Sequence, residues 1–382
     1  MRILFDISPA VHRHGGLGRY ASELLRALLQ IDRANDYHAF YSKLGAGEQV
    51  DPALDRLPAH TLGLPAKPWR MGVLLAELAH IPMDTWLPPC DLFHATEHLL
   101  PPLQRAGSVF TIHDLIFLRF PEYHLPLNRW YLSLMLPRFL RRADALIAVS
   151  ENTKRDVVKL MQIPPDKITV IYEGVNPAYK PLDDRAARDR VREKYNLPAE
   201  YILCFATLEP RKNLLTLLDA YHALLARDQA VPALVLAGRK GWLYQPIFAR
   251  VHELGLEDRV HFTDWVAEQD APVIMNMASV FVFPSLYEGF GLPPLEAMAC
   301  GTPLICSNAS SLPEVVGAGG LLFEPRDVGA LANALARVLA DAELRAQLRG
   351  RGIEQARKFT WERAARETLA VYQAVEKQHT RR

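Results

Sequence analysis

Two glutamates with seven residues between them form the densest group of chemically useful residues in the chain. The run from Glu288 to Glu296 reads EGFGLPPLE and follows an apolar segment at 280–283. Its two glycines let the backbone approach a ligand, and its two prolines fit the start of a helix, where backbone amides attract anions such as a pyrophosphate. Carboxylates accept hydrogen bonds from the vicinal hydroxyls of a sugar or a ribose. The run therefore predicts a site for a ligand with both phosphate and hydroxyl groups.

Each glutamate also has a simpler structural explanation. Glu296 is predicted in the first turn of the helix, where an acid complements the helix dipole. Glu288 is explained as a solvated loop acid.

Arg211 and Lys212 form a second candidate site. They follow an apolar segment at 201–207 and precede a predicted helix at 214–226. Two cations at a helix start oppose its dipole, which disfavours a purely structural role, whereas a bound diphosphate reverses the sign. The simpler interpretation is two solvated surface cations.

A third candidate is His113, which ends the apolar segment 108–112 and is followed by Asp114. A lone histidine is more often structural. The end of a strand is, however, the place where parallel sheets bind ligands, so we predict a functional role for His113.

The run GLGRYA at 16–21 matches the dinucleotide fingerprint G-x-G-x-x-A. A nicotinamide-dependent oxidoreductase is therefore an alternative, but the fingerprint needs a tight turn after its strand. Here a long segment separates strand from motif, and the second strand ends at Tyr41, Ser42 and Lys43, with no acid for a ribose. Two other interpretations stay open. One is a flexible loop with a helix cap, and the other is a Gly-rich loop whose amides approach an anionic or hydroxylated ligand.

Two further sequence patterns suggest other functions. The run HATEH at 94–98 matches a zinc-peptidase motif, but that chemistry needs both histidines on one helix face, and prolines follow at 101 and 102. We interpret it as a loop that lines the site. The basic, aromatic stretch at 129–142 predicts peripheral contact with anionic lipid or, equally, an ordinary helix with a basic outer face.

Length and charge narrow the class of protein. The chain has 382 residues, which predicts two domains, and its 44 Lys and Arg balance 43 Asp and Glu, which argues against a nucleic-acid partner. Cys90, Cys204, Cys300 and Cys306 are predicted to be buried free thiols, as in a reducing cytoplasm. The amino terminus does not read as a signal peptide, and no segment approaches the roughly 18 apolar residues of a spanning helix.

The elements that position these residues alternate between strand and helix, which is typical of parallel sheets. Strands in the first half are predicted at 2–7, 38–42, 92–94, 108–112, 145–149 and 169–171, with helices at 18–30 and 127–141. The segment 172–198 is predicted to be a linker plus the first helix of a new domain. Strands follow at 201–207, 233–237, 260–263, 280–283 and 303–306. Helices in this half are predicted at 214–226, 246–254, 270–277, 294–299, 327–340, 343–358 and 361–377. Two facing Rossmann-like, doubly wound α/β domains follow, with the site in the cleft between them.

Taken together, the motifs resemble the family-4 (group 1) retaining glycosyltransferases of the GT-B fold. The EGFGLPPLE run is the specific part, and the resemblance covers essentially the whole chain. The accompanying motifs, in the family's order, are GGLGRY at 15–20, His113-Asp114, VSENT at 149–153, GVN at 174–176 and EPRKN at 209–213. The chain looks most like the bacterial mannosyltransferases of surface-polysaccharide synthesis.

The resemblance implies an acceptor-side domain at 1–175, joined by a final helix at about 361–382, and a donor-binding domain at 176–360. It implies that Glu288 and the amides of Phe290 and Gly291 hold the donor sugar, and that Glu296 holds the ribose. Arg211, Lys212 and the amide of Leu292 would neutralise the diphosphate. The remaining implied contacts are His113 beside the transferred sugar, Gly16 and Gly18 near the phosphate and acceptor, and Val266 near the base.

The implied reaction moves a sugar, with GDP-mannose as the best guess for the donor, to a glycan or lipid-linked hydroxyl with retention of configuration. The implied donor carries GDP rather than UDP, and no cofactor or metal is expected, because the chain contains no Asp-x-Asp pair. Many relatives carry an arginine where this chain has Thr207, and we hypothesise that Arg211 replaces it. A non-catalytic sugar-nucleotide-binding protein is the main alternative, and a phosphorylase or epimerase on the same plan is another.

Overall fold

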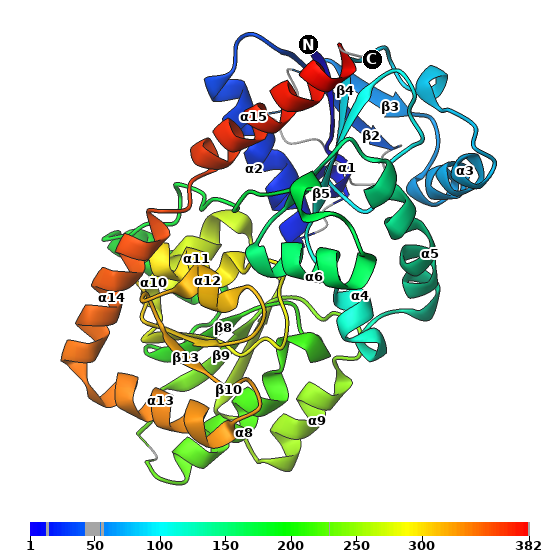
Figure 1. The fold of residues 1–382 in the computed structure, drawn as a ribbon. Helices are drawn as coiled ribbons and strands as arrows, with labels where there is room; N and C mark the ends of the chain where they lie inside the picture. The colour runs from blue at the N-terminus through cyan, green and yellow to red at the C-terminus, as the bar shows by residue number, and fades with distance from the viewer. Residues whose placement is uncertain (13–14, 43–53, 55–56, 229, 381–382) are drawn as a thin grey trace. The chain divides into compact units, whose positions relative to one another are not determined.

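The computed structural model describes residues 1–12, 15–42, 54, 57–228 and 230–380. Its contacts divide the chain into two units. The N-terminal unit consists of Met1–Gly174 with Thr360–Arg382, and the C-terminal unit is Val175–Phe359. Each unit has one parallel sheet with helices packed against it (Figure 1). This confirms the predicted α/β class with two Rossmann-like domains.

The N-terminal unit contains seven parallel strands in the order β3-β2-β1-β4-β5-β6-β7. Their bounds are β1 Arg2–Asp6, β2 Asp36–Ser42, β3 Ala59–Leu62, β4 Leu92–Ala95, β5 Gly107–Ile112, β6 Ala145–Ala148 and β7 Ile168–Val170. The chain enters at β1 in the middle of the sheet, builds outward to β3, and then crosses back to β4. All carboxyl ends of these strands therefore lie along one edge of the sheet.

Helices cover both faces of this sheet. Their bounds are α1 Ser8–Val11, α2 Gly15–Ile31, α3 Ala66–Leu78, α4 Ile116–Arg119, α5 Pro126–Arg142, α6 Glu151–Met161 and α15 Trp361–His379, with short 3₁₀ turns at Asp84–Trp86, Pro121–Tyr123 and Pro165–Lys167. The final helix α15 packs along α2 (Figure 1). Helices α3 and α5 share one buried apolar cluster with the sheet. Right-handed crossovers place them on the face opposite α2.

The C-terminal unit contains six parallel strands in the order β10-β9-β8-β11-β12-β13. The strands are β8 Tyr201–Phe205, β9 Ala233–Ala237, β10 Val260–Asp264, β11 Val280–Phe283, β12 Leu304–Ser307 and β13 Leu321–Phe323. The helices are α7 Arg185–Lys194, α8 Leu214–Leu225, α9 Gln245–Glu253, α10 Ala271–Met277, α11 Leu292–Ala299, α12 Leu312–Val316, α13 Val328–Ala340 and α14 Ala342–Ala356, with 3₁₀ turns at Pro210–Lys212 (η4) and Glu268–Asp270. The unit has the same plan as its neighbour in the chain, with β8 and β11 at its centre.

The predicted strands and helices are present, and several bounds needed correction. Helix α2 begins at Gly15, so the glycine motif lies in its first turn rather than in a loop. The pair Arg211 and Lys212 lies in the 3₁₀ turn η4, which precedes α8, so its place before the predicted helix is confirmed. The elements α1, β3, α3, α4, α6, α12 and β13 were not predicted. Lys43, used in the argument against a dinucleotide site, lies outside the described residues.

The cysteines are free, and three of the four are buried as predicted. Cys90 is only partly buried, because it lies in the segment before β4 and borders an open cavity. Within the described part of the chain, no helix combines the length and the apolar composition that crossing a bilayer requires.

Candidate active site

The EGFGLPPLE run connects β11 to α11 at the carboxyl edge of the C-terminal sheet. Gly291 precedes α11 with φ of +119°, a backbone conformation that favours glycine, and prolines occupy the start of the helix. Ser311 holds the loop by donating hydrogen bonds to the carbonyl oxygens of Glu288 (2.9 Å) and Phe290 (2.7 Å). The amide of Glu288 donates to Ser310 Oγ at 2.8 Å. The loop is thus fixed in place before any ligand binds.

Arg211, Lys212 and Glu288 form one buried ion-pair cluster. Arg211 Nη1 lies 2.7 Å from Glu288 Oε2, and Lys212 Nζ lies 2.6 Å from Glu288 Oε1. Arg211 Nη2 also pairs with Glu209 Oε1 at 2.7 Å, and Ser285 Oγ donates to Glu288 Oε1 at 2.6 Å. The four charged side chains are between 2 and 17 % exposed. The structure therefore joins two predicted sites, Arg211-Lys212 and Glu288, that are far apart in the chain.

This geometry sets the charge state of Glu288. Burial raises the pKa of its carboxyl, but the charges of Arg211 and Lys212 and the hydrogen bonds from Lys212 and Ser285 outweigh that effect and hold the pKa at about 2. Glu288 is therefore ionised at neutral pH. The two cations, Arg211 and Lys212, are balanced in formal charge by the two carboxylates, Glu209 and Glu288, so the cluster is a neutral group.

The structural explanations of these residues are wrong. Glu288 is not a solvated loop acid, and Arg211 and Lys212 are not solvated surface cations, because all three are largely buried. Glu296 lies in the second turn of α11 rather than the first and is buried, so it does not serve as a solvent-exposed partner of the helix dipole. Glutamates are seldom fully buried, so the burial of Glu296 requires an explanation other than the helix dipole.

The remaining predicted donor residues lie in two places. Phe290 and Leu292 are buried beside Glu288 and Gly291, and the ring of Phe290 packs edge-to-face on Phe359 with ring centroids 5.8 Å apart. Val266 follows β10, which lies three strands from β11 in the sheet order. At about 4.8 Å per strand, β10 and β11 are on the order of 14 Å apart, and the contact of Val266 with the base stays a prediction.

His113 lies at the end of β5, at the carboxyl edge of the N-terminal sheet. Its Nε2 lies 3.0 Å from the carbonyl oxygen of Thr96, which can only accept, so Nε2 carries the hydrogen. Its Nδ1 lies 3.5 Å from Glu173 Oε1, and both side chains are less than 10 % exposed. The Tyr20 ring meets the imidazole edge-on, with centroids 4.7 Å apart.

Glu173 was not predicted. It is a buried carboxylate just after β7, and His113 follows β5, so the order β5-β6-β7 in the sheet brings the two side chains together across one intervening strand. The only signal in the sequence is a charged residue that follows an apolar strand, which is too common to single out.

A second group of ionisable side chains lies at the same edge, after β1 and β4. Burial raises the pKa of Asp6 to about 7, and the nearby charge of Glu97 adds to the increase. Arg70 Nη2 lies 3.6 Å from Glu97 Oε2. Burial lowers the pKa of His98 to about 4 despite the opposing charge of Asp114. With its pKa near neutrality, Asp6 can donate or accept a hydrogen bond, as recognition of a hydroxyl requires.

The HATEH run does not form a helical metal site. His94 lies on β4, and both its ring nitrogens are engaged, Nδ1 with Tyr372 Oη at 2.6 Å and Nε2 with Thr111 Oγ1 at 2.8 Å. It is a buried structural residue that ties β4 to α15, and its place on a strand is as predicted. Among the described residues, no group of three His, Cys, Asp or Glu side chains is arranged to hold a metal ion.

The two predicted glycines differ. A side chain at Gly18 would meet the carbonyl oxygen of Pro9 at 2.8 Å, so this glycine allows α2 to pack on α1. A side chain at Gly16 would meet no atom within 4 Å, so its backbone faces open space.

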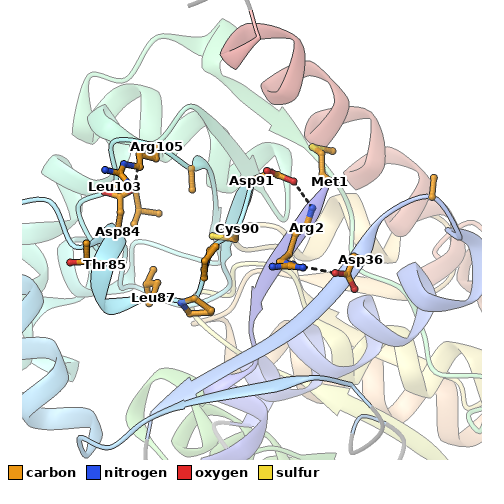
Figure 2. Close-up of a pocket in the computed structure, with 14 residues that line it drawn as sticks. Met1, Arg2, Asp36, Asp84, Thr85, Leu87, Cys90, Asp91, Leu103 and Arg105 are labelled. Carbon is orange, nitrogen blue, oxygen red and sulfur yellow. Dashed lines mark hydrogen bonds and ion pairs between the residues drawn. The ribbon is translucent and has the colours of Figure 1, made fainter.

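A cavity of about 790 Å³ lies at the opposite, amino-terminal edge of the N-terminal sheet (Figure 2). Its charged lining is internally paired. The Arg2 amide donates to Asp91 Oδ2 at 2.6 Å, and Arg2 Nε donates to Asp36 Oδ2 at 3.2 Å. The cavity is therefore separate from the edge that carries Asp6 and His113.

The chain is similar to known glycosyltransferases in both of its units. The family described as glycosyltransferase family 4 matches residues 14–179, and glycosyl transferases group 1 matches residues 187–355. The solved sucrose-phosphate synthase of Thermosynechococcus elongatus has a TM-score of 0.79 at 23 % identity and covers 98 % of this chain and 99 % of that one. The fold is that of the GT-B glycosyltransferases.

Two relatives in Escherichia coli are similar to this chain in sequence. The O-antigen chain mannosyltransferase B of Escherichia coli is 32 % identical over 381 residues, which cover 97 % of this chain and 99 % of that protein. The serotype-specific mannosyltransferase WbdA of Escherichia coli is 36 % identical over 267 residues, 68 % of this chain and 32 % of that protein. The chain belongs to the group 1, family-4 glycosyltransferases. This confirms the resemblance and removes the oxidoreductase and peptidase interpretations.

Proposed function

We propose that this glycosyltransferase moves mannose from GDP-mannose to a hydroxyl of a glycan or lipid-linked acceptor, with retention of anomeric configuration. The observation that carries the proposal is the buried cluster of Arg211, Lys212 and Glu288 beside Gly291 and the start of α11. The choice of mannose rests on relatives that are named as mannosyltransferases. The choice of GDP rests on the same likeness.

The donor's diphosphate is already a good leaving group, so the protein needs chiefly to stabilise the charge that builds up on the bridging oxygen. In this proposal Arg211, Lys212 and the amides of Gly291 and Leu292 supply that stabilisation without a metal ion. Chelation with EDTA is expected to leave the rate unchanged.

The neutrality of the cluster adds a step to this proposal. A diphosphate that entered beside two fully paired cations would gain little net attraction. We therefore propose that hydroxyls of the donor sugar donate to Glu288 and replace its bond to Lys212, whose ammonium then turns to the phosphate. The ammonium of Lys212 would thus become available to the phosphate only after a sugar has bound to Glu288. The amide of Phe290 would hold another sugar hydroxyl, and Glu296 would hold the ribose diol.

In the N-terminal unit, the proposal places His113 beside the transferred sugar, with the Glu173 carboxylate 3.5 Å from its Nδ1. Asp6, Glu97 and Gly16 would border the acceptor. No side chain is assigned as a covalent nucleophile, so retention would follow from attack on the same face from which the leaving group departs. Proton NMR of the first product formed tests this point, since it distinguishes retained from inverted anomers.

Thermal unfolding with GDP, UDP, ADP and dTDP tests the donor assignment. A nucleotide present at 100 times its Kd stabilises the folded chain by about 2.7 kcal/mol. We expect GDP to give the largest shift. A larger shift with another nucleotide would reassign the donor, and no shift with any of them would argue against donor binding.

The main alternative, a sugar-nucleotide-binding protein without catalysis, predicts binding but no turnover. A phosphorylase or epimerase would not release a nucleoside diphosphate on addition of an acceptor. We further propose a cytoplasmic location, with peripheral membrane contact to reach a lipid-linked acceptor.

A further inference from the structure

Exposed apolar side chains gather on one part of the N-terminal unit. Among the described residues, 14 large hydrophobic side chains are exposed, and nine of them lie in two short segments, at 64–86 and 125–130. These segments contain α3, with its flanks, and the start of α5. Soluble surfaces seldom concentrate large apolar residues in this way unless the patch contacts a partner.

Helix α3 carries a continuous apolar stripe on its outer face. Met71, Leu75 and Leu78 follow one another at spacings of four and three residues and are 54, 59 and 49 % exposed. Leu64 and Ile81 extend the stripe beyond both ends of the helix. The opposite face of α3, with Trp69, Val73 and Leu74, is buried in the core.

The outer face of α5 continues this surface. Leu127 and Trp130 are 79 and 57 % exposed at the start of the helix, three residues apart. The two helices lie on the same face of the sheet, and Arg142 Nε at the end of α5 pairs with Glu77 Oε2 near the end of α3 at 3.1 Å. Both helices are labelled on the same side of the N-terminal unit in Figure 1.

The charged side chains on these two helices are mostly positive. Together α3 and α5 contain six cations and a single acid, Glu77, which is engaged by Arg142. Lys67, Arg129, Arg138 and Arg141 are exposed. Arg142 itself turns inward and donates to the carbonyl oxygens of Leu100 and Pro101, which corrects the sequence-based expectation that it faces a membrane.

We propose that the outer faces of α3 and α5 form a docking surface for an anionic phospholipid bilayer. Exposed leucines, a methionine and a tryptophan enter the interfacial region, while the surrounding lysine and arginines contact lipid phosphates. An apolar stripe without acids fits a negatively charged, apolar surface and would repel a basic partner. Both helices follow strands that end at the carboxyl edge, so they start at the edge that carries His113, and Arg70 on α3 reaches Glu97 there.

This docking surface would place the edge of the N-terminal unit that carries His113 next to the bilayer that holds a lipid-linked acceptor. That consequence rests on the proposed function, whereas the docking itself does not. Binding to vesicles and response to nucleotides can therefore be measured separately on the same protein.

Flotation of the full chain with vesicles tests the proposal. We expect binding to vesicles of phosphatidylcholine mixed with phosphatidylglycerol, weaker binding to phosphatidylcholine alone, and release by salt. The variant Met71→Ser/Leu75→Ser/Leu78→Ser should lower the partition coefficient by at least about ten-fold. The charge variant Lys67→Glu/Arg129→Glu should lower binding to the anionic vesicles selectively.

The matched control is Leu215→Ser/Leu322→Ser, which removes two exposed leucines from the C-terminal unit and should bind as the parent does. Each variant must keep the thermal unfolding transition and the nucleotide-induced shift of the parent. Unchanged vesicle binding by both α3 and charge variants would overturn the proposal. Self-association that is lost in the apolar variant, with no vesicle binding by the parent, would overturn it in favour of an interface between copies of the chain.

Discussion

Replacement of Glu288 by glutamine removes one buried negative charge while keeping the shape of the side chain. In the parent, this carboxylate is bound by Arg211, Lys212 and Ser285. In the variant, Arg211 keeps Glu209 as a partner, but Lys212 loses the carboxylate 2.6 Å from its ammonium. A buried cation without its partner is strongly destabilising.

The pKa of Glu288 gives the size of the effect. Its carboxyl has a pKa of about 2 in the folded chain against an ordinary value of 4.5. Each pKa unit corresponds to about 1.4 kcal/mol, so the folded protein favours the ionised form by about 3 kcal/mol. Because the folded pKa is the lower one, this stability is fully present above pH 4.5 and is lost as the pH falls through about 2. Glu288→Gln should therefore lose about 3 kcal/mol at pH 7 and progressively less below pH 4.5.

Equilibrium denaturation in urea, at neutral pH and again near the low end of this window, measures the difference. The matched control is Glu253→Gln, because Glu253 pairs with Arg250 on the surface at 3.0 Å and is 59 % exposed. Such exposed pairs contribute at most about 1 kcal/mol. A Glu288→Gln loss no larger than that of the control, or a loss independent of pH, would refute the ion-pair reasoning.

Three further variants test other parts of the site. Arg211→Ala should weaken nucleoside-diphosphate binding by at least about ten-fold if this arginine supplies the charge missing at Thr207, and normal affinity by calorimetry would sink that hypothesis. Glu173→Gln should lower kcat more than it changes KM, with Glu173→Asp restoring part of the rate, because a carboxylate 3.5 Å from His113 Nδ1 stabilises positive charge that develops on the ring in the transition state; equal effects on both constants would indicate a general structural defect. Asp6→Asn should stabilise the chain by about 4 kcal/mol above pH 7 and hardly at all near pH 4, since burial raises the pKa of Asp6 from 3.8 to about 7 and its ionisation costs stability as the pH rises. A pH-independent effect would contradict that assignment.

The sequence predicted those strands and helices whose own residues show a clear hydrophobic pattern. The apolar runs of β9 and β11 were predicted with the observed bounds, because their side chains are buried and uninterrupted. In contrast, β3 is an edge strand with alternating partial exposure and only four residues, which leaves no clear period. Helix α3 was missed because Met71, Leu75 and Leu78 make its outer face as apolar as its inner one.

The site was predicted in its parts but not in its pairing. Glu288 and Arg211 were predicted separately, because each lies in a short motif whose residue types and spacing indicate ligand binding. Their ion pair depends on β8 and β11 being neighbours in the sheet, which brings together residues 77 positions apart in the sequence. Glu173 was missed because its place near His113 depends on the sheet order β5-β6-β7, and nothing near it in the sequence points to His113. Local patterns therefore predicted the ligand chemistry, whereas the charge balance of the site required the fold.

The central claim is tested most directly by incubation of the purified chain with GDP-mannose, with and without a mannose-terminated glycan acceptor, and measurement of both GDP and product. The proposed function predicts GDP release that depends on the acceptor and a product with one added mannose in the anomeric configuration of the donor. Donor binding with no product on any such acceptor, or an inverted product, would contradict it.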